Sequence, residues 1–322
     1  MTDVPGGPSH PLADSELLAR LESTSRTFAL AIPLLEEPLR REVGLAYLLL
    51  RVADTLEDAA PWTREERRTA LSELELLLQG GAGAQALERS RGWLERRPSE
   101  NADYLLLVED TSRLLASLDA LRPEAGAIVR HFVLRTTRGM REVLAGATEQ
   151  GLLTLSSLEE LRAYCYIVAG LVGELLTELF LLDTRLTPSA PELRALAAGF
   201  GEALQLVNIL KDAAEDSEEG RTLLPHSVRL EDVHALAAKD LVVAARYVSA
   251  LHSSGASRGV LAFTVMPLQL AHATLELLVR QGPGAKVSRA EVTSQLTALH
   301  EALQRGVLPD EVVRLAQSPI EE

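Results

Sequence analysis

Apolar positions along the chain recur at intervals of three and four residues, and this period predicts helices. Leucine and alanine dominate these positions, and alternation of valine and isoleucine at a period of two is almost absent. The expected helices cover residues 36–58, 156–183 and 187–216, and about 101–119, 122–146, 232–252, 258–280 and 288–306. Pro38 suits a first helical turn, and Ser157 with Glu160 forms a capping-box pattern. The Gly-rich and then charged segment 79–101 is expected to be a surface connection.

These segments predict an all-α protein with one compact helical domain over residues 14–310. The Pro- and Gly-containing residues 1–13 are expected to form a flexible tail, and residues 311–322 a C-terminal tail. The sequence has no βαβ pattern, no Walker loop and no repeat in the solenoid range. Dinucleotide-binding α/β folds and solenoids are therefore excluded.

Composition and charge narrow the classes of function. The chain has 322 residues, of which 46 are acidic and 32 are Lys or Arg, so its net charge is −14. This balance argues against a nucleic-acid partner, which needs cations to neutralise phosphates. The single cysteine, Cys165, excludes disulfides and cysteine zinc sites and is expected in the core. The histidines are scattered without helical pair spacing, so a histidine metal site is not expected.

No segment of the sequence is expected to span a membrane. The N-terminus lacks the apolar core and positive flank of a signal peptide. The longest uncharged run, residues 259–275, is shorter than the ~20 residues of a span and includes Pro267, Gln269 and His272. We expect a buried helix there, and a cytoplasmic protein that contacts a membrane at most transiently and peripherally.

A polar stripe crosses the otherwise apolar helix expected over residues 36–58. Tyr47, Arg51, Asp54 and Asp58 lie at positions i, i+4, i+7 and i+11, which share one helical face. Their neighbours are mostly leucine and valine. Because unpaired buried charge is costly, such a stripe must face a wet cavity or a bound ion.

A second stripe of the same design lies within residues 187–216. Gln205, Asn208, Asp212 and Asp216 are spaced at i, i+3, i+7 and i+11, and Arg221 follows the helix. Two carboxylates one turn apart can bind Mg²⁺, which often shares its remaining ligand positions with substrate phosphates. Spacing alone leaves open the alternative that each acidic pair is a solvated helix face.

Three sequence blocks, residues 24–58, 163–180 and 204–225, resemble the squalene/phytoene synthase family in order and spacing. A weaker block at residues 262–275, with 285–292 after it, resembles the C-terminal part of squalene synthases. The motifs "DTLED" and "YCYIVAGLVG" are most similar to the squalene synthase branch. The resemblance implies an isoprenoid-synthase-type helical bundle with a central cavity.

The resemblance also implies an activity. Family members condense two farnesyl diphosphates head to head with Mg²⁺, through presqualene diphosphate, and reductive members use NADPH to form squalene. One alternative is a non-reductive phytoene or dehydrosqualene synthase, or a member that makes presqualene diphosphate or hydroxysqualene. A remote alternative is a non-catalytic helical assembly protein.

The implied site residues fall into four groups. Metal binding is expected of Asp54, Glu57, Asp58, Asn208, Asp212 and Asp216. Catalytic roles are expected of Tyr164, placed beside the reacting carbons, and of Arg51, Asp54, Asp58, Asp212 and Asp216. Substrate binding is expected of Arg26, Phe28, Tyr47, Gln205, Asn208, Lys211, Arg221 and Phe263. Contact with NADPH is expected of Arg26, Arg51, Lys211, Lys286 and Arg289.

The chain departs from the family pattern at three positions. Lys211 stands where many members have arginine, and therefore keeps the charge without the planar fork. Leu268 and Ser288 stand where glutamine and arginine are common, with Gln269 and Arg289 one residue later. These departures fall in the reductive half of the machinery, so the use of NADPH and the final product stay open. The sequence also leaves the downstream pathway and the oligomeric state open.

Overall fold

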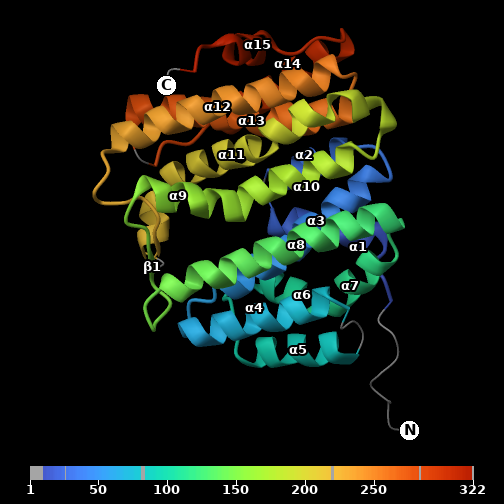
Figure 1. Cartoon of the computed structure of the whole chain (residues 1–322), viewed down its shortest axis with the longest axis vertical. Helices are drawn as coiled ribbons and strands as arrows, with labels where there is room; N and C mark the ends of the chain where they lie inside the picture. Colours follow the sequence, from blue (N-terminus) through green and yellow to red (C-terminus); the bar gives the residue numbers. More distant parts are fainter. Residues whose placement is uncertain (1–9, 26, 81–83, 219–220, 283, 321–322) are drawn as a thin grey trace. The chain divides into compact units, whose positions relative to one another are not determined.

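The structure is a computed structural model that describes all residues except 1–9, 26, 81–83, 219–220, 283 and 321–322, and no side chains within 214–221. Its described elements are helices apart from two short strands, β1 (Leu153–Thr154) and β2 (Arg221–Thr222), which pair with each other (Figure 1). The all-α prediction is therefore confirmed.

The chain forms two compact units. The first comprises residues 1–30 and 37–153, and the second comprises residues 31–36 and 154–322. The domain boundaries expected from the sequence stay a prediction.

Helix α3 is the centre of the first unit. It packs against α1, α4, α6, α7 and α8, and its residues Leu45, Leu48, Leu49, Val52 and Leu56 are fully buried. The helices of this unit are α1 (Asp14–Thr24), α3 (Leu39–Glu57), α4 (Arg64–Leu78), α5 (Ala84–Glu95), α6 (Ala102–Glu109), α7 (Thr111–Asp119) and α8 (Pro123–Val143), which the 3₁₀ turn η2 (Leu144–Gly146) follows. The short helix α2 (Phe28–Ala31) lies at the boundary between the two units.

Three local predictions for this unit need correction. Pro38 is the residue before α3 rather than its first-turn residue. The helix expected over 101–119 is divided at Asp110, which is buried and paired with Arg20 and Arg113. The segment expected as a surface connection contains α5, because Ala86, Ser90 and Trp93 form a sparse buried face.

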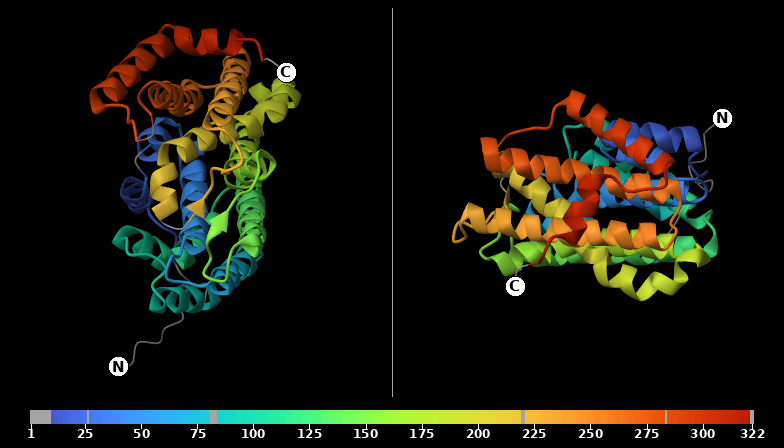
Figure 2. Two further views of the ribbon diagram at one scale, coloured as in Figure 1. Left: turned by 90° about the vertical axis from the view of Figure 1, so that its left-hand side faces the viewer. Right: turned by 90° about the horizontal axis from the view of Figure 1, so that it is seen from above.

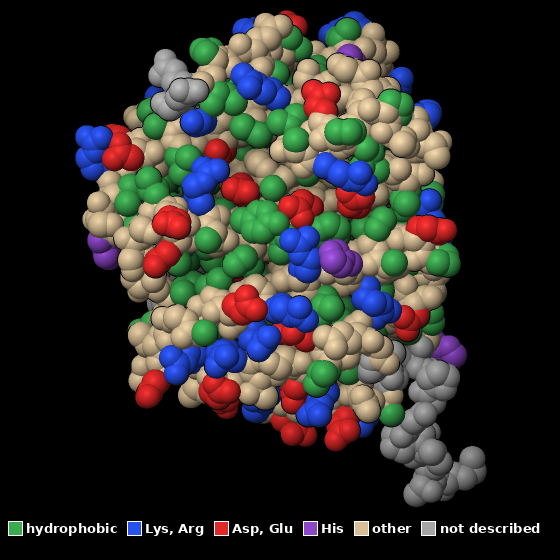
Figure 3. Space-filling model, viewed as in Figure 1, with side chains coloured by type: hydrophobic (Ala, Val, Ile, Leu, Met, Phe, Trp, Pro, Cys, Tyr) green, Lys and Arg blue, Asp and Glu red, His purple; other side chains and the backbone are tan. Residues whose placement is uncertain are grey.

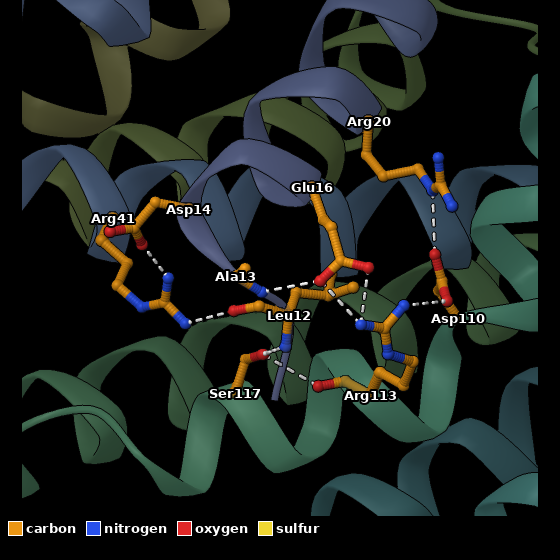
Figure 4. Close-up of polar contacts among 9 residues, drawn as sticks. All are labelled: Leu12, Ala13, Asp14, Glu16, Arg20, Arg41, Asp110, Arg113 and Ser117. Atoms are coloured by element: carbon orange, nitrogen blue, oxygen red, sulfur yellow. Dashed lines mark hydrogen bonds and ion pairs between the residues drawn. The ribbon is translucent and has the colours of Figure 1, made fainter. Parts of the chain in front are cut away.

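A network of polar contacts fastens α1 to the first unit (Figure 4). Arg113 donates to Glu16 at 2.7 Å and also pairs with Asp110, while Arg20 donates to Asp110 at 2.8 Å. The backbone N–H of Leu12 donates to Ser117 Oγ, and Arg41 bonds both Asp14 and the carbonyl of Leu12. These contacts, made by residues 12–20, fasten the first two turns of α1, and Thr24 is the last residue of the same helix.

Basic side chains follow α8 on the surface of the first unit (Figure 3). The helix carries Arg130, Arg135, Arg138 and Arg141. Arg138 and Arg141 pair with Glu75, Arg130 pairs with Asp119, and Arg135 lies over the ring of Phe132. Carboxylates therefore offset much of this positive charge.

The second unit is built around α11, which packs against α10, α12 and α13. Its helices are η1 (Ile32–Leu34), α9 (Leu158–Cys165), η3 (Tyr166–Gly170), α10 (Leu171–Phe180), η4 (Thr184–Ser189), α11 (Ala190–Glu218), α12 (Leu230–Ser253), α13 (Arg258–Gln281), α14 (Arg289–Gln304) and α15 (Asp310–Gln317). The segment η3 is a π-helical turn that joins α9 to α10. Ser157 caps α9 by accepting from the N–H of Glu160, although the Glu160 carboxylate accepts from Ser156 rather than from Ser157.

Glycines let α11 approach η3 and α10 closely. A Cβ atom on Gly201 would lie 1.9 Å from the carbonyl oxygen of Ala169, and one on Gly173 would lie 2.0 Å from that of Ala197. No real side chain fits at such distances without a backbone shift. This contact fixes the position of α11 relative to the segment that follows Tyr164.

Among the residues that the structure describes, three helices are long and apolar enough to cross a membrane, judged by length and composition alone. They are residues 158–180, 184–213 and 258–281, and half or more of each apolar window is buried inside the protein. The 24-residue helix α13 contains the run 259–275, so the argument that this segment is too short was wrong. Its expected burial is confirmed, since residues such as Phe263, Val265 and Leu268 are almost fully buried.

Helix α15 lies across α12 within the second unit (Figure 2), where a tail was expected. His272 Nδ1 on α13 is 2.6 Å from Glu311 Oε1 on α15. The hydrogen bond to Glu311 raises the pKa of His272 above 6.5, and the same bond lowers the pKa of Glu311 below 4.5.

We expect this pair to make stability depend on pH. Because its pKa is higher in the folded protein, protonated His272 stabilises the fold fully below pH 6.5. This stabilisation is lost as pH rises through the raised pKa. Because its pKa is lower in the folded protein, ionised Glu311 stabilises the fold fully above pH 4.5. This stabilisation is lost as pH falls through the lowered pKa. Between pH 6 and 8.5 the melting temperature of the wild type should fall more than that of His272→Gln. An equal fall in the melting temperatures of the wild type and His272→Gln would show that the His272–Glu311 pair does not contribute to the pH dependence of stability.

Candidate functional site

The last turn of α3 carries Asp54 and Glu57, and Asp58 is the C-cap residue. Asp54 is half-buried, Glu57 is buried and Asp58 is exposed. The last turn has no basic residue. Carboxylates at a helix C-terminus oppose the helix dipole, at about 0.3–1 kcal/mol each. A cation that approaches the end of α3 would therefore be attracted both by these carboxylates and by the helix dipole.

Arg67 on α4 binds the backbone at the end of α3. Its Nη1 donates to the carbonyl of Glu57 at 3.3 Å and to that of Gly151 at 3.1 Å, and its Nε donates to the carbonyl of Trp62. The side chain is buried, so it holds the end of α3 in place. The sequence did not indicate Arg67, because these hydrogen bonds go to backbone carbonyls, which no pattern of side chains reveals.

Four of the predicted residues, Phe28, Tyr47, Arg51 and Asp54, form a connected set of contacts. Arg51 Nη1 lies 3.3 Å from Asp54 Oδ2, and Arg51 Nη2 donates to the Tyr47 hydroxyl at 3.2 Å. The Tyr47 hydroxyl donates to the carbonyl of Thr24 at 3.0 Å, and the Phe28 ring contacts the Tyr47 ring at 5.4 Å. Burial lowers the pKa of Arg51, but Asp54 and Tyr47 outweigh it, so the pKa is raised and the guanidinium stays charged.

The second stripe lies on α11. Lys211 Nζ donates to Asn208 Oδ1 at 3.3 Å and pairs with Asp212 Oδ2 at 3.1 Å. Gln205 is half-buried one turn earlier on the helix. The side chains of Asp216 and Arg221, and the whole of Arg26, lie outside the described residues. Their roles, like that of the second stripe as a metal site, stay predictions.

Tyr164 is buried in the last turn of α9, two residues before the π-helical turn η3 begins. Single π turns inside helices often occur at functional sites, because they redirect the side chains on either side. The neighbouring thiol of Cys165 is buried, and burial raises its pKa to about 12. Cys165 is therefore an inert core residue, as expected.

The remaining predicted residues occupy two different environments in the second unit. Phe263 is fully buried in α13, and its ring contacts the Phe180 ring edge-on at 6.3 Å. Lys286 and Arg289 are exposed where α14 begins. Ser288, which replaces the common arginine, caps α14 by accepting from the N–H of Glu291. Gln269 is buried and hydrogen-bonds Glu311, so it serves the docking of α15.

The donor atoms fit a metal ion that shares its ligands with a substrate. Within the part of the chain that the structure describes, no three His, Cys, Asp or Glu side chains are placed to bind a metal by themselves. Each stripe supplies only oxygen donors, which a hard cation prefers. Mg²⁺ usually keeps waters and binds through one or two carboxylates and substrate phosphates. The residues therefore fit Mg²⁺ bound together with a diphosphate.

Comparison with known proteins identifies the family. The model of the squalene/phytoene synthase family matches residues 21–296. The chain is 32% identical over 210 residues to a probable squalene synthase of Neurospora crassa, covering 65% of this chain and 41% of that protein. It is 30% identical over 245 residues to a squalene synthase of Candida albicans, covering 70% and 51%. The chain thus belongs to the squalene/phytoene synthase family and spans about half the length of these curated relatives.

Solved structures share the helical fold. A structure of TcSQS with the ligand BPH1237 matches with a TM-score of 0.73 at 21% identity, covering 95% of this chain and 92% of that chain. A dehydrosqualene synthase in complex with a ligand matches with a TM-score of 0.61 at 19% identity, covering 90% and 96%. At these identities the likeness establishes the fold alone.

Proposed function

We propose that this chain is a Mg²⁺-dependent prenyltransferase that condenses two farnesyl diphosphates head to head, through presqualene diphosphate, and forms squalene with NADPH. The observation that carries the proposal is the acidic end of α3 beside the paired guanidinium of Arg51. A helix end with carboxylates next to a charged arginine suits a metal–diphosphate ligand, because the carboxylates can bind the metal cation and the arginine can bind the diphosphate anion. Membership in the squalene/phytoene synthase family supplies the substrate class.

Metal and diphosphate binding are proposed for the polar residues of each stripe. Bound Mg²⁺ would stabilise the negative charge that develops on the departing diphosphate. The residues proposed to hold it are Asp54, Glu57, Asp58, Asn208, Asp212 and Asp216. Arg51 offers a planar fork of N–H donors to the phosphate oxygens, whereas Lys211 offers a compact point charge. Gln205, Tyr47, Phe28, Phe263, Arg26 and Arg221 are the further proposed substrate-binding residues.

Tyr164 is proposed to lie beside the reacting carbons. Its burial limits water near the phenol, and water would quench an allylic cation. The electron-rich face of its ring would stabilise such a cation, and its hydroxyl would accept a hydrogen bond or a proton.

The proposed nucleotide contacts are Arg26, Arg51, Lys211, Lys286 and Arg289. Lys286 and Arg289 are exposed cations at the beginning of α14, which suits the phosphates of NADPH. NADPH, when bound, would supply the hydride of the reductive step. We further propose a cytoplasmic location with transient membrane contact, because the hydrocarbon product partitions into lipid.

Product analysis tests the proposal. Purified protein with farnesyl diphosphate and Mg²⁺ should yield squalene only when NADPH is present, and presqualene diphosphate when it is omitted. Gas chromatography with mass spectrometry distinguishes the products, and geranylgeranyl diphosphate serves as the competing substrate. Dehydrosqualene with and without NADPH, or phytoene from geranylgeranyl diphosphate, would establish the non-reductive alternative. The absence of any condensation product would refute the proposed activity.

A further inference from the structure

The guanidinium of Arg51 lies close to the rings of Tyr47 and Tyr104. Its Cζ atom is 5.6 Å from the ring centroid of Tyr47 and 5.7 Å from that of Tyr104. Both distances are within the ~6 Å range of cation–π attraction. Arg51 also bonds the Tyr47 hydroxyl and pairs with Asp54. Contacts from α3 and from α6 therefore restrict one flexible side chain.

The two rings are themselves held by local contacts. Tyr47 donates to the carbonyl of Thr24, at the end of the firmly docked helix α1. Tyr104 lies in the first turn of α6, where Asn101 Oδ1 caps the helix by accepting from the N–H groups of Asp103 and Tyr104. The aromatic surroundings of Arg51 are thus preorganised by two separate helices.

Arg51 keeps bonding capacity inside this arrangement. The Nε atom of Arg51 is shielded from solvent, and its N–H has no hydrogen-bond partner among the residues that the structure describes. Leaving a buried charged donor unpaired costs free energy, and an acceptor oxygen from a bound anion would recover it. Since the side chain is already ordered, binding would cost little further conformational entropy.

We propose that Tyr104 is a positioning residue that holds the guanidinium of Arg51 in the orientation that binds a diphosphate. This inference rests on the proposed function, because it assigns Tyr104 to the same diphosphate site. Tyr104 acts through the face of its ring, so the hydroxyl is dispensable and the aromatic ring is required. It acts through Arg51, so its contribution disappears when the guanidinium is removed.

A double-mutant cycle tests both requirements. Isothermal titration calorimetry with inorganic pyrophosphate and Mg²⁺ compares the wild type, Tyr104→Phe, Tyr104→Leu and Arg51→Ala with Tyr104→Leu in the Arg51→Ala background. Tyr104→Leu should weaken pyrophosphate binding roughly 5–20-fold, as expected for loss of a partly desolvated cation–π contact. Tyr104→Phe should remain within about twofold of the wild type, because it keeps the ring. In the Arg51→Ala background, Tyr104→Leu should have no further effect.

Other outcomes overturn the inference. The first is that Tyr104→Leu binds pyrophosphate as tightly as the wild type. The second is that Tyr104→Phe loses as much affinity as Tyr104→Leu. The third is that Tyr104→Leu loses the same affinity with Arg51 present as with Ala at position 51. The melting temperature of each variant shows whether it has a folding defect. If Tyr104→Leu is unstable, the cycle is repeated with Tyr104→Met in its place. Product analysis of the wild type keeps the two proposals apart. A wild type that binds pyrophosphate but forms no condensation product refutes the proposed activity and leaves the role of Tyr104 to be decided by the cycle.

Discussion

Asp54→Asn and Asp212→Asn are each expected to lower turnover of farnesyl diphosphate by about 10²–10³-fold. Each substitution removes one negative charge but keeps the size of the side chain. The metal would then bind more weakly, and the departing diphosphate would be less well stabilised. Steady-state kinetics at saturating Mg²⁺ should show the loss in kcat. The fold should persist, because Asp54 and Asp212 are only half-buried, and their pairs with Arg51 and Lys211 contribute at most about 1 kcal/mol.

Matched controls remove a carboxylate from an arginine ion pair elsewhere in each unit. Asp119 pairs with Arg130 in the first unit, and Asp232 pairs with Arg229 in the second. Asp119→Asn and Asp232→Asn should leave turnover within about twofold of the wild type, because exposed pairs contribute little. If Asp54→Asn or Asp212→Asn behaved like its control, the helix stripe that contains it would not be a metal site.

Gly201→Ala is expected to destabilise the protein by roughly 3 kcal/mol. The new methyl group would lie 1.9 Å from the carbonyl oxygen of Ala169, so α11 must move away from η3. The movement should also displace Tyr164 relative to Gln205 and Asn208, and turnover should fall together with stability. Thermal unfolding followed by circular dichroism measures the first effect, and the rate of product formation measures the second.

Gly92→Ala is the control for this substitution. Gly92 lies within α5, and a Cβ atom there would meet no atom within 4 Å. Alanine favours a helix interior over glycine, so this variant should gain roughly 0.5–1 kcal/mol. A Gly201→Ala variant as stable as the wild type would contradict the close approach of α11 to η3.

Periodicity predicted the helices best where one face is continuously apolar. The helix over Leu39–Glu57 was found because leucines recur along it, and its polar stripe was visible for the same reason. Helix α5 was missed because its buried face consists of alanine, serine and one tryptophan. The π-helical turn after Tyr164 could not be predicted, because it depends on close packing against α11 rather than on local preference.

The candidate site was predictable only where its residues share a helix. Tyr47, Arg51 and Asp54 come together because helical spacing requires it, and the structure confirms their contacts. Arg67 and Tyr104 belong to other helices, and no local pattern links them to α3. Tertiary packing alone brings them to the acidic end of that helix.

The acidic helices α3 and α11 are proposed to bind a metal–diphosphate. Release of pyrophosphate from farnesyl diphosphate, followed during titration of Mg²⁺ into chelator-treated protein, tests it most directly. We expect no pyrophosphate release in the presence of the chelator and a rise to the full rate as Mg²⁺ is added. For Asp54→Asn we expect a lower rate at every Mg²⁺ concentration. Release that is unchanged by the chelator, or equal in wild type and Asp54→Asn, would contradict it.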